Sequence, residues 1–232
     1  MLTTDGKGFF TITGLRRTRR SLVRKKVEIE LRKRFPRQDF AFLGDPFRGL
    51  PLPLLLSERD RNVHATTRLL WCWTRLNQFS VEQLRPALAA GNIVLTDGFG
   101  LDALIYATSC VECELENREA ERLHHGLVQI RVKAQGINPP EYFIMNADPE
   151  TVDAWMVEGL PDLKDVDRNV RMKFIEQQWA TITRYFQPEH GQNPPRYFEA
   201  SAEEVAGAMV EAIANHIQGI PEQTVTAFRR RV

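Results

Sequence analysis

The chain of 232 residues is 43% hydrophobic and carries a formal net charge of +1, which fits one ordinary globular domain with a sizeable core. It has no run of about 18 apolar residues, which excludes a membrane span, and its first residues lack the charged start and apolar stretch of a signal peptide. Three cysteines are too few and too unevenly placed for a disulfide framework, which favours a reducing, cytoplasmic location.

Short apolar segments alternate with helical patterns along the whole chain. Strands are predicted at 8–13, 40–43, 93–95, 142–145 and 196–198. Helices are predicted at 21–35, 60–76, 80–90, 101–123, 174–186 and 201–217, with Ser80 as a helix-capping residue. This order predicts an α/β fold, a parallel five-stranded sheet with helices on both faces, whose ligands bind at the carboxyl ends of the strands.

Basic residues are concentrated in segment 16–34, where only Glu28 and Glu30 oppose them. The basic side chains are Arg16, Arg17, Arg19, Arg20, Arg24, Lys25, Lys26, Arg32, Lys33 and Arg34. Such a cluster attracts phosphate, either of a nucleotide or along a nucleic acid. A solvated helix face is the alternative interpretation, because charge runs usually lie on the surface.

Residues 69–107 carry the most informative pattern, LLWCWTRLNQFSVEQLRPALAAGNIVLTDGFGLDALIYA. It resembles the thymidylate kinase family, in which a helix with Phe-Ala-Ala-Asp-Arg is followed by a Pro-Ala-Leu-Ala-x-Gly helix end. An apolar strand and Asp-Arg-Tyr then lead into a Ser-x-Ala-Tyr helix in that family. The match is closest at 85–91, and the order of the flanking pieces is kept.

Collinear pieces from about residue 8 to about 217 extend this resemblance. It implies a single domain over 1–232 with the P-loop NTPase, nucleotide-kinase-like three-layer sandwich. It also implies a lid segment at 160–170 and a homodimer, and the arginines near the end of the chain predict a C-terminal basic tail at 218–232. The activity implied is phosphoryl transfer from ATP, with Mg²⁺, to dTMP or a related nucleoside monophosphate.

The segment aligned with the P-loop is strongly altered. A P-loop, G-x-x-x-x-G-K-S/T, surrounds phosphates with backbone amides, a lysine and a magnesium-binding hydroxyl. The first glycine is kept as Gly14 and the final hydroxyl as Ser21. Arg19 stands in place of the second glycine, Arg20 in place of the lysine, and Arg16 in place of an acidic residue of the family. The positions assigned to nucleotide phosphates are Gly14, Arg16, Arg17, Arg19, Arg20 and Ser21.

The acceptor side of the predicted site has lost two arginines of the family pattern. Gly44 stands in place of the Arg of an Arg-Glu-Pro turn, and Gly98 stands in place of the Arg of Asp-Arg-Tyr. Asp45 remains in the turn, and Arg48 is a candidate substitute for one lost cation. Asp97 is kept, and the resemblance implies that Asp97 and Ser21 bind magnesium and that Arg20 and Asp97 take part in catalysis.

The base pocket implied by the resemblance is better preserved. Trp71 stands where the family has a phenylalanine that stacks on thymine, and Arg75 stands where an arginine binds the base. Tryptophan stacks at least as well as phenylalanine. The alternative is that Trp71 is a core residue and Arg75 a surface charge.

Two further groups of residues have both a functional and a structural interpretation. Lys164, Arg168 and Arg171 are candidate lid cations, and Arg168 is assigned to catalysis; the alternative is a solvated loop. Cys110 and Cys113 with His124 and His125 have zinc-ligand types, but a lone C-x-x-C in a predicted helix favours half-buried thiols.

Two hypotheses of different classes remain after this comparison. The first is a divergent nucleoside-monophosphate kinase. The second is a catalytically inactive pseudo-kinase that binds a nucleotide, a nucleic acid or a protein, because the loss of one charge-stabilising group typically costs about 10²-fold or more in rate.

Overall fold

The fold is that of a computed structural model, which describes residues 8–14, 20–47, 63–109, 114–137, 140–145, 147–159, 161–186, 196–198 and 202–219. No helix among these residues is long and apolar enough to cross a bilayer.

A parallel sheet forms the centre of the molecule, in the strand order β2-β3-β1-β4-β5. Its strands are β1 (Phe9–Gly14), β2 (Phe40–Leu43), β3 (Ile93–Asp97), β4 (Glu141–Met145) and β5 (Arg196–Phe198). β1 lies between β3 and β4, so the chain changes direction across the sheet beside β1. In sheets of this kind the crevice at the carboxyl ends of such strands binds ligands.

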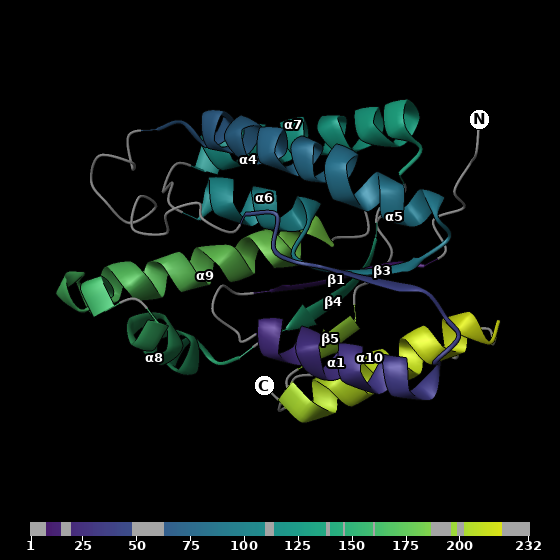
Figure 1. The fold of residues 1–232 in the computed structure, drawn as a ribbon. Coiled ribbons are helices and arrows are strands. Elements are labelled where there is room, and N and C mark those ends of the chain that lie inside the picture. Colours follow the sequence, from purple (N-terminus) through teal and green to yellow (C-terminus); the bar gives the residue numbers. More distant parts are fainter. Residues whose placement is uncertain are drawn as a thin grey trace.

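Helices cover both faces of the sheet, as predicted (Figure 1). One face is covered by α1 (Arg20–Arg34) and α10 (Ala202–Ile217). The other face is covered by α4 (Ala65–Phe79), η1 (Ser80–Leu84), α5 (Arg85–Ala89), α6 (Gly100–Thr108), α7 (Glu114–Gln135) and α9 (Arg168–Tyr185). The remaining elements, α8 (Pro149–Gly159) and the 3₁₀ turn η2 (Pro161–Asp165), precede α9.

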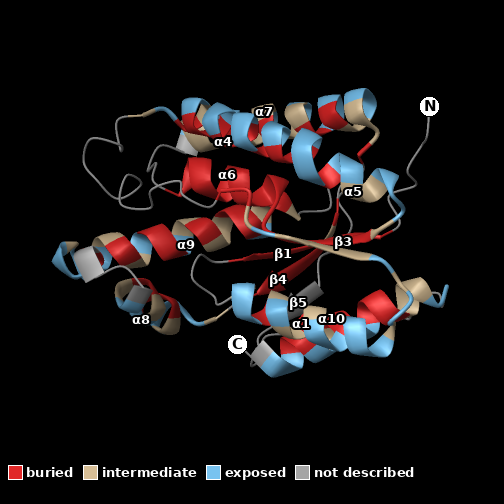
Figure 2. Cartoon of the chain, viewed as in Figure 1, coloured by how far each residue is buried: buried red, intermediate tan, exposed pale blue. Residues whose placement is uncertain are grey.

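The sheet divides the buried apolar residues into two clusters. Phe9 packs on the α4, α6 and α9 side, whereas Phe10 and Ile12 pack on the α1 and α10 side. This alternation follows from the two-residue period of a strand, and all six residues of β1 are buried because helices cover both faces of the sheet. α6, which follows β3 in the chain, is buried along its whole length (Figure 2).

Several helix boundaries differ from those predicted. Ser80 does not cap a new helix: its φ of −64° and ψ of −40° are helical, and its hydroxyl donates to the carbonyl of Leu76 at 2.7 Å. A π-helical turn, η1, joins α4 to α5 instead. The predicted helix 101–123 is divided into α6 and α7, and Cys110 and Cys113 lie outside the described residues.

Candidate functional site

Arg20 is the central residue of the candidate site. It begins α1, directly beyond the carboxyl end of β1, and its side chain is only 10% exposed. Its Nη1 donates a short hydrogen bond to Oδ1 of Asp102, and its Nε lies 3.4 Å from Oδ1 of Asp97 at the end of β3. Arg20 is therefore held by two carboxylates.

Asp102 was not predicted as a site residue, yet it organises the cluster. Its Oδ2 accepts hydrogen bonds from the hydroxyl of Thr13 at 2.6 Å and from the backbone N–H of Phe99 at 3.0 Å. The available signal was its position in the first turn of a helix that follows a strand, where a carboxylate commonly accepts from an orphan backbone N–H. Its ion-pair partner, Arg20, is 82 positions away, so no local sequence pattern indicates that the two residues meet.

The electrostatics of the cluster favour a charged Arg20. Burial alone would lower the pKa of Arg20, but Asp102, Asp97 and Asp45 together raise that pKa above its ordinary value. Burial, with the neighbouring Asp102, raises the pKa of Asp97 despite the attraction of Arg20 and Arg24. The charge of the guanidinium is thus already compensated within the protein.

Two glycines permit the backbone to adopt the shape of this site. Gly14 has a φ of +139°, and a Cβ on it would lie 2.1 Å from the carbonyl oxygen of Met145. Gly98 has a φ of +89°, and its N–H donates to the carbonyl of Ile12 at 2.9 Å. A Cβ on Gly98 would lie 3.2–3.4 Å from the Asp102 carboxyl group. The turn at Gly98 therefore packs closely against Asp102.

A groove of about 210 Å³ adjoins this cluster. It is lined by the turn after β2 and by one side of α4 and η1, namely Gly44, Asp45, Pro46, Arg75, Gln78, Phe79, Glu82 and Gln83. Asp45 accepts from the N–H of Phe47 at 2.7 Å, which fixes the turn, and it also contributes to the raised pKa of Arg20. The structure thus brings Asp45 and Arg75 together beside the Arg20 cluster.

The other predicted site residues differ in how they are placed. Trp71 lies one helical turn before Arg75 and is 59% exposed, so it is not a core residue, and it does not line the groove. Ser21 is the second residue of α1 and is exposed. Arg16, Arg17, Arg19 and Arg48 lie outside the described residues.

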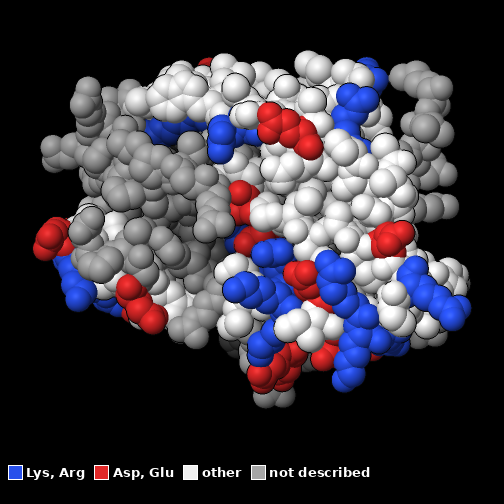
Figure 3. All heavy atoms as spheres, in the orientation of Figure 1, with Lys and Arg blue, Asp and Glu red and all other residues white. Residues whose placement is uncertain are grey.

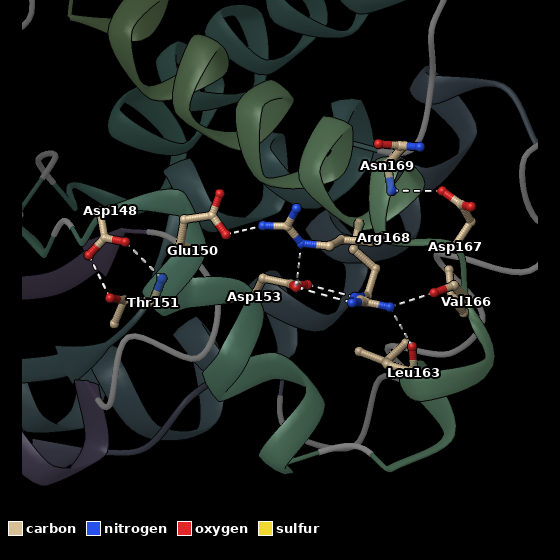
Figure 4. Close-up of polar contacts among 10 residues, drawn as sticks. Asp148, Glu150, Thr151, Asp153, Leu163, Val166, Asp167, Arg168 and Asn169 are labelled. Carbon is tan, nitrogen blue, oxygen red and sulfur yellow. Dashed lines mark hydrogen bonds and ion pairs between the residues drawn. The ribbon is translucent and has the colours of Figure 1, made fainter.

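Two of the three candidate lid cations, Arg168 and Arg171, pair with carboxylates of α8 (Figure 4). Arg168 pairs with Glu150 of α8 through a short contact, and its Nε lies 4.0 Å from Asp153. Arg171 is buried and donates to both carboxylate oxygens of Asp153, at 2.6 and 3.1 Å, and to the carbonyls of Leu163 and Val166. Arg171 therefore fastens α8 and the η2 turn to α9.

Replacing Arg171 with Met is expected to lower the free energy of unfolding by about 3–5 kcal/mol, because the buried Asp153 carboxylate loses both of its hydrogen bonds to Arg171 and keeps only the 4.0 Å contact with Arg168 among the described residues. Urea denaturation measures this loss. Arg168→Met is the matched control and is expected to cost less than about 1 kcal/mol, since that ion pair is exposed. Equal losses in the two variants would contradict this assignment.

The candidate magnesium ligands do not fit a metal ion in this arrangement. Asp97 faces the Arg20 guanidinium, so a divalent cation on its carboxylate would meet a fixed positive charge. The described part of the chain also contains no group of three or more His, Cys, Asp or Glu side chains placed to hold a metal. Asp97 serves here as an ion-pair partner.

The basic segment lies partly on the outer side of α1, where Figure 3 shows blue side chains gathered among red ones. Lys26 pairs with Glu203 and Arg34 with Glu211, both of α10, while Arg32 pairs with Glu28 one turn away. These ion pairs neutralise part of the charge and join α1 to α10. They support the interpretation of α1 as a solvated helix face more than a nucleic-acid surface.

Comparisons with known proteins agree with the architecture. No family model matches the chain, and no curated protein matches it in sequence. Its structure is similar to the crystal structure of thymidylate kinase from Ehrlichia chaffeensis, with a TM-score of 0.57 and 13% identity. The similarity covers 90% of this chain and 99% of that protein. At this identity the likeness concerns the fold, and the chain has a nucleotide-kinase-like α/β fold.

Proposed function

We propose that this chain is a pseudo-kinase, a protein that binds a nucleoside monophosphate in the groove beside Arg75 and has lost efficient phosphoryl transfer. The observation that carries the proposal is the ion-pair cluster of Arg20 with Asp97 and Asp102. Phosphoryl transfer is catalysed mainly by positioning and by neutralising charge on the phosphates. In this site the cation that would do so is neutralised by carboxylates of the protein.

This arrangement is expected to lower the rate of phosphoryl transfer by several orders of magnitude. A phosphate that approached Arg20 would have to displace Asp102, leaving that buried carboxylate without its ion pair. Glycines also occupy both positions where the resemblance implies phosphate-binding arginines, Gly44 and Gly98. The loss of each such group typically costs about 10²–10³ in rate, so two losses alone amount to about 10⁴ or more.

Binding of a nucleoside monophosphate depends less on the Arg20 cluster than phosphoryl transfer does. The groove offers a cation, Arg75, from α4, a carboxylate, Asp45, from the turn after β2, and the aromatic ring of Phe79. The exposed indole of Trp71 lies one turn from Arg75 on α4, outside the lining. Charged and aromatic groups at a concave surface are typical of sites that orient a polar, planar ligand. These features support a nucleobase and its sugar as the occupants.

Thermal unfolding with dTMP, combined with a phosphoryl-transfer assay with ATP and Mg²⁺, tests the proposal. At 100 times its dissociation constant, dTMP is expected to stabilise the chain by about 2.7 kcal/mol. Arg75→Ala is expected to weaken that effect, and turnover is expected to lie about 10⁴-fold or more below the 1–100 s⁻¹ that is typical of kinases. Turnover near 1 s⁻¹ would make the chain an active kinase, and no response to dTMP would refute binding.

A further inference from the structure

Arg68 of α4 is a buried cation whose terminal nitrogens have no ion pair or hydrogen bond among the described residues. The residue is 4% exposed, and neither Nη1 nor Nη2 has a hydrogen-bond partner. Arginine stays protonated in proteins, so it cannot avoid the cost of burial by losing its charge. Buried charges are ordinarily paired, and an unpaired one lowers stability substantially. Arg68 is therefore an anomaly that an anionic ligand would remove.

The other buried arginines of the described residues have compensating contacts. Arg171 is held by Asp153 and two carbonyls. The Nε and Nη1 of Arg131 also lack hydrogen-bond partners, but its guanidinium lies over the rings of Phe99 and Trp73, at 4.3 and 5.1 Å from their centroids. Such cation–π contacts offset part of the cost of burial. Among the described residues Arg68 has neither kind of contact, so they do not explain its burial.

The position of Arg68 on α4 relates it to the groove. Arg68 and Arg75 are seven positions apart and therefore lie on the same side of the helix, separated along its axis by about 10.5 Å. Arg75 lines the groove, and Trp71 lies between the two arginines in sequence. A separation of this size is comparable to the span from the base of a nucleoside monophosphate to its 5′-phosphate.

We propose that Arg68 binds the phosphate of the nucleoside monophosphate. It would take the role that the resemblance implies for arginines at positions 44 and 98, where this chain has glycines. This inference rests on the proposed function, in which the base lies near Arg75. A guanidinium recognises phosphate with two parallel hydrogen bonds, and the two unpartnered nitrogens of Arg68 suit that contact. Because both nitrogens are shielded from water, the ligand reaches them only after a local rearrangement.

Affinities for dTMP and for thymidine, measured by calorimetry on three variants of the full chain, test the assignment. Arg68→Met is expected to weaken dTMP binding by about 10- to 100-fold and to leave thymidine binding unchanged. Arg68→Lys keeps the charge and is expected to retain part of the dTMP affinity. Arg75→Met is the matched control on the same helix side and is expected to weaken both ligands alike.

The melting temperature without ligand separates this role from a structural one. Arg68→Met removes an unpaired buried charge and is expected to raise that temperature by about 2–4 °C or more. A lower melting temperature, or an unchanged ratio of dTMP to thymidine affinity, would overturn the assignment.

If the unaltered chain binds neither ligand, the proposed function fails, and inorganic phosphate alone then tests Arg68. Stabilisation of the unaltered chain by phosphate, lost in Arg68→Met, sustains the anion site. If phosphate stabilises the unaltered chain and Arg68→Met equally, or stabilises neither, the anion site at Arg68 is overturned.

Discussion

Replacing Asp102 with Ala is expected to lower the free energy of unfolding by about 3–5 kcal/mol, measured by urea denaturation. The change removes three contacts of one carboxylate, with Arg20, with the hydroxyl of Thr13 and with the N–H of Phe99. Arg20 would retain only the longer contact with Asp97 and would be largely unpaired in a buried site. The loss is large because a charge is left behind, rather than because the pair itself is strong.

A double-mutant cycle with Arg20→Met checks this explanation. In the Arg20→Met background no guanidinium is left unpaired, so Asp102→Ala is expected to cost less, with a coupling of about 0.5–3 kcal/mol. Asp102→Asn is expected to be milder than Asp102→Ala, because an amide oxygen still accepts from Thr13 or Phe99. Additive losses in the cycle would show that Arg20 and Asp102 act independently.

Replacing Gly14 with Ala is expected to destabilise the chain by about 3–5 kcal/mol, from backbone strain together with overpacking. Its φ of +139° is a conformation that only glycine adopts easily, and the added Cβ would lie 2.1 Å from the carbonyl oxygen of Met145. Backbone atoms of two paired strands cannot move apart without breaking the β1–β4 ladder. The melting temperature and the urea midpoint report the loss.

Gly207 provides the matched control for this prediction. It lies within α10, and a Cβ on it would have no atom within 4 Å. Gly207→Ala is therefore expected to stabilise the chain by about 0.5–1 kcal/mol through helix propensity. A loss at Gly207 similar to that at Gly14 would show that the space around each glycine does not govern these effects.

The arrangement of strands and helices was predictable because it rests on local patterns. The apolar run 8–13 anticipated β1, and the run 93–95 anticipated β3, with Asp97 at the carboxyl end where it is found. Ser80 was misassigned because a serine followed by acidic and amide residues is also compatible with a continuous helix. Local sequence does not distinguish an N-cap from the start of a π-helical turn.

The candidate site was less predictable because it depends on contacts between distant segments. The sequence placed Arg20 after β1, but nothing local indicated that Asp102 would neutralise it. Arg168 was assigned to the reaction centre as a lid cation, whereas its ion-pair partner, Glu150, lies on α8. Arg68 gave no signal, since an arginine in an amphipathic helix is ordinarily exposed.

The positive φ of Gly98 has an evolutionary consequence. An arginine introduced at this position alone would strain the backbone and place a Cβ 3.2–3.4 Å from the Asp102 carboxyl group. Changing Asp102 first would instead leave the Arg20 guanidinium without its closest ion pair in a buried site. Each single change therefore passes through a destabilised intermediate, so positions 98 and 102 are expected to change together during evolution or to stay as they are.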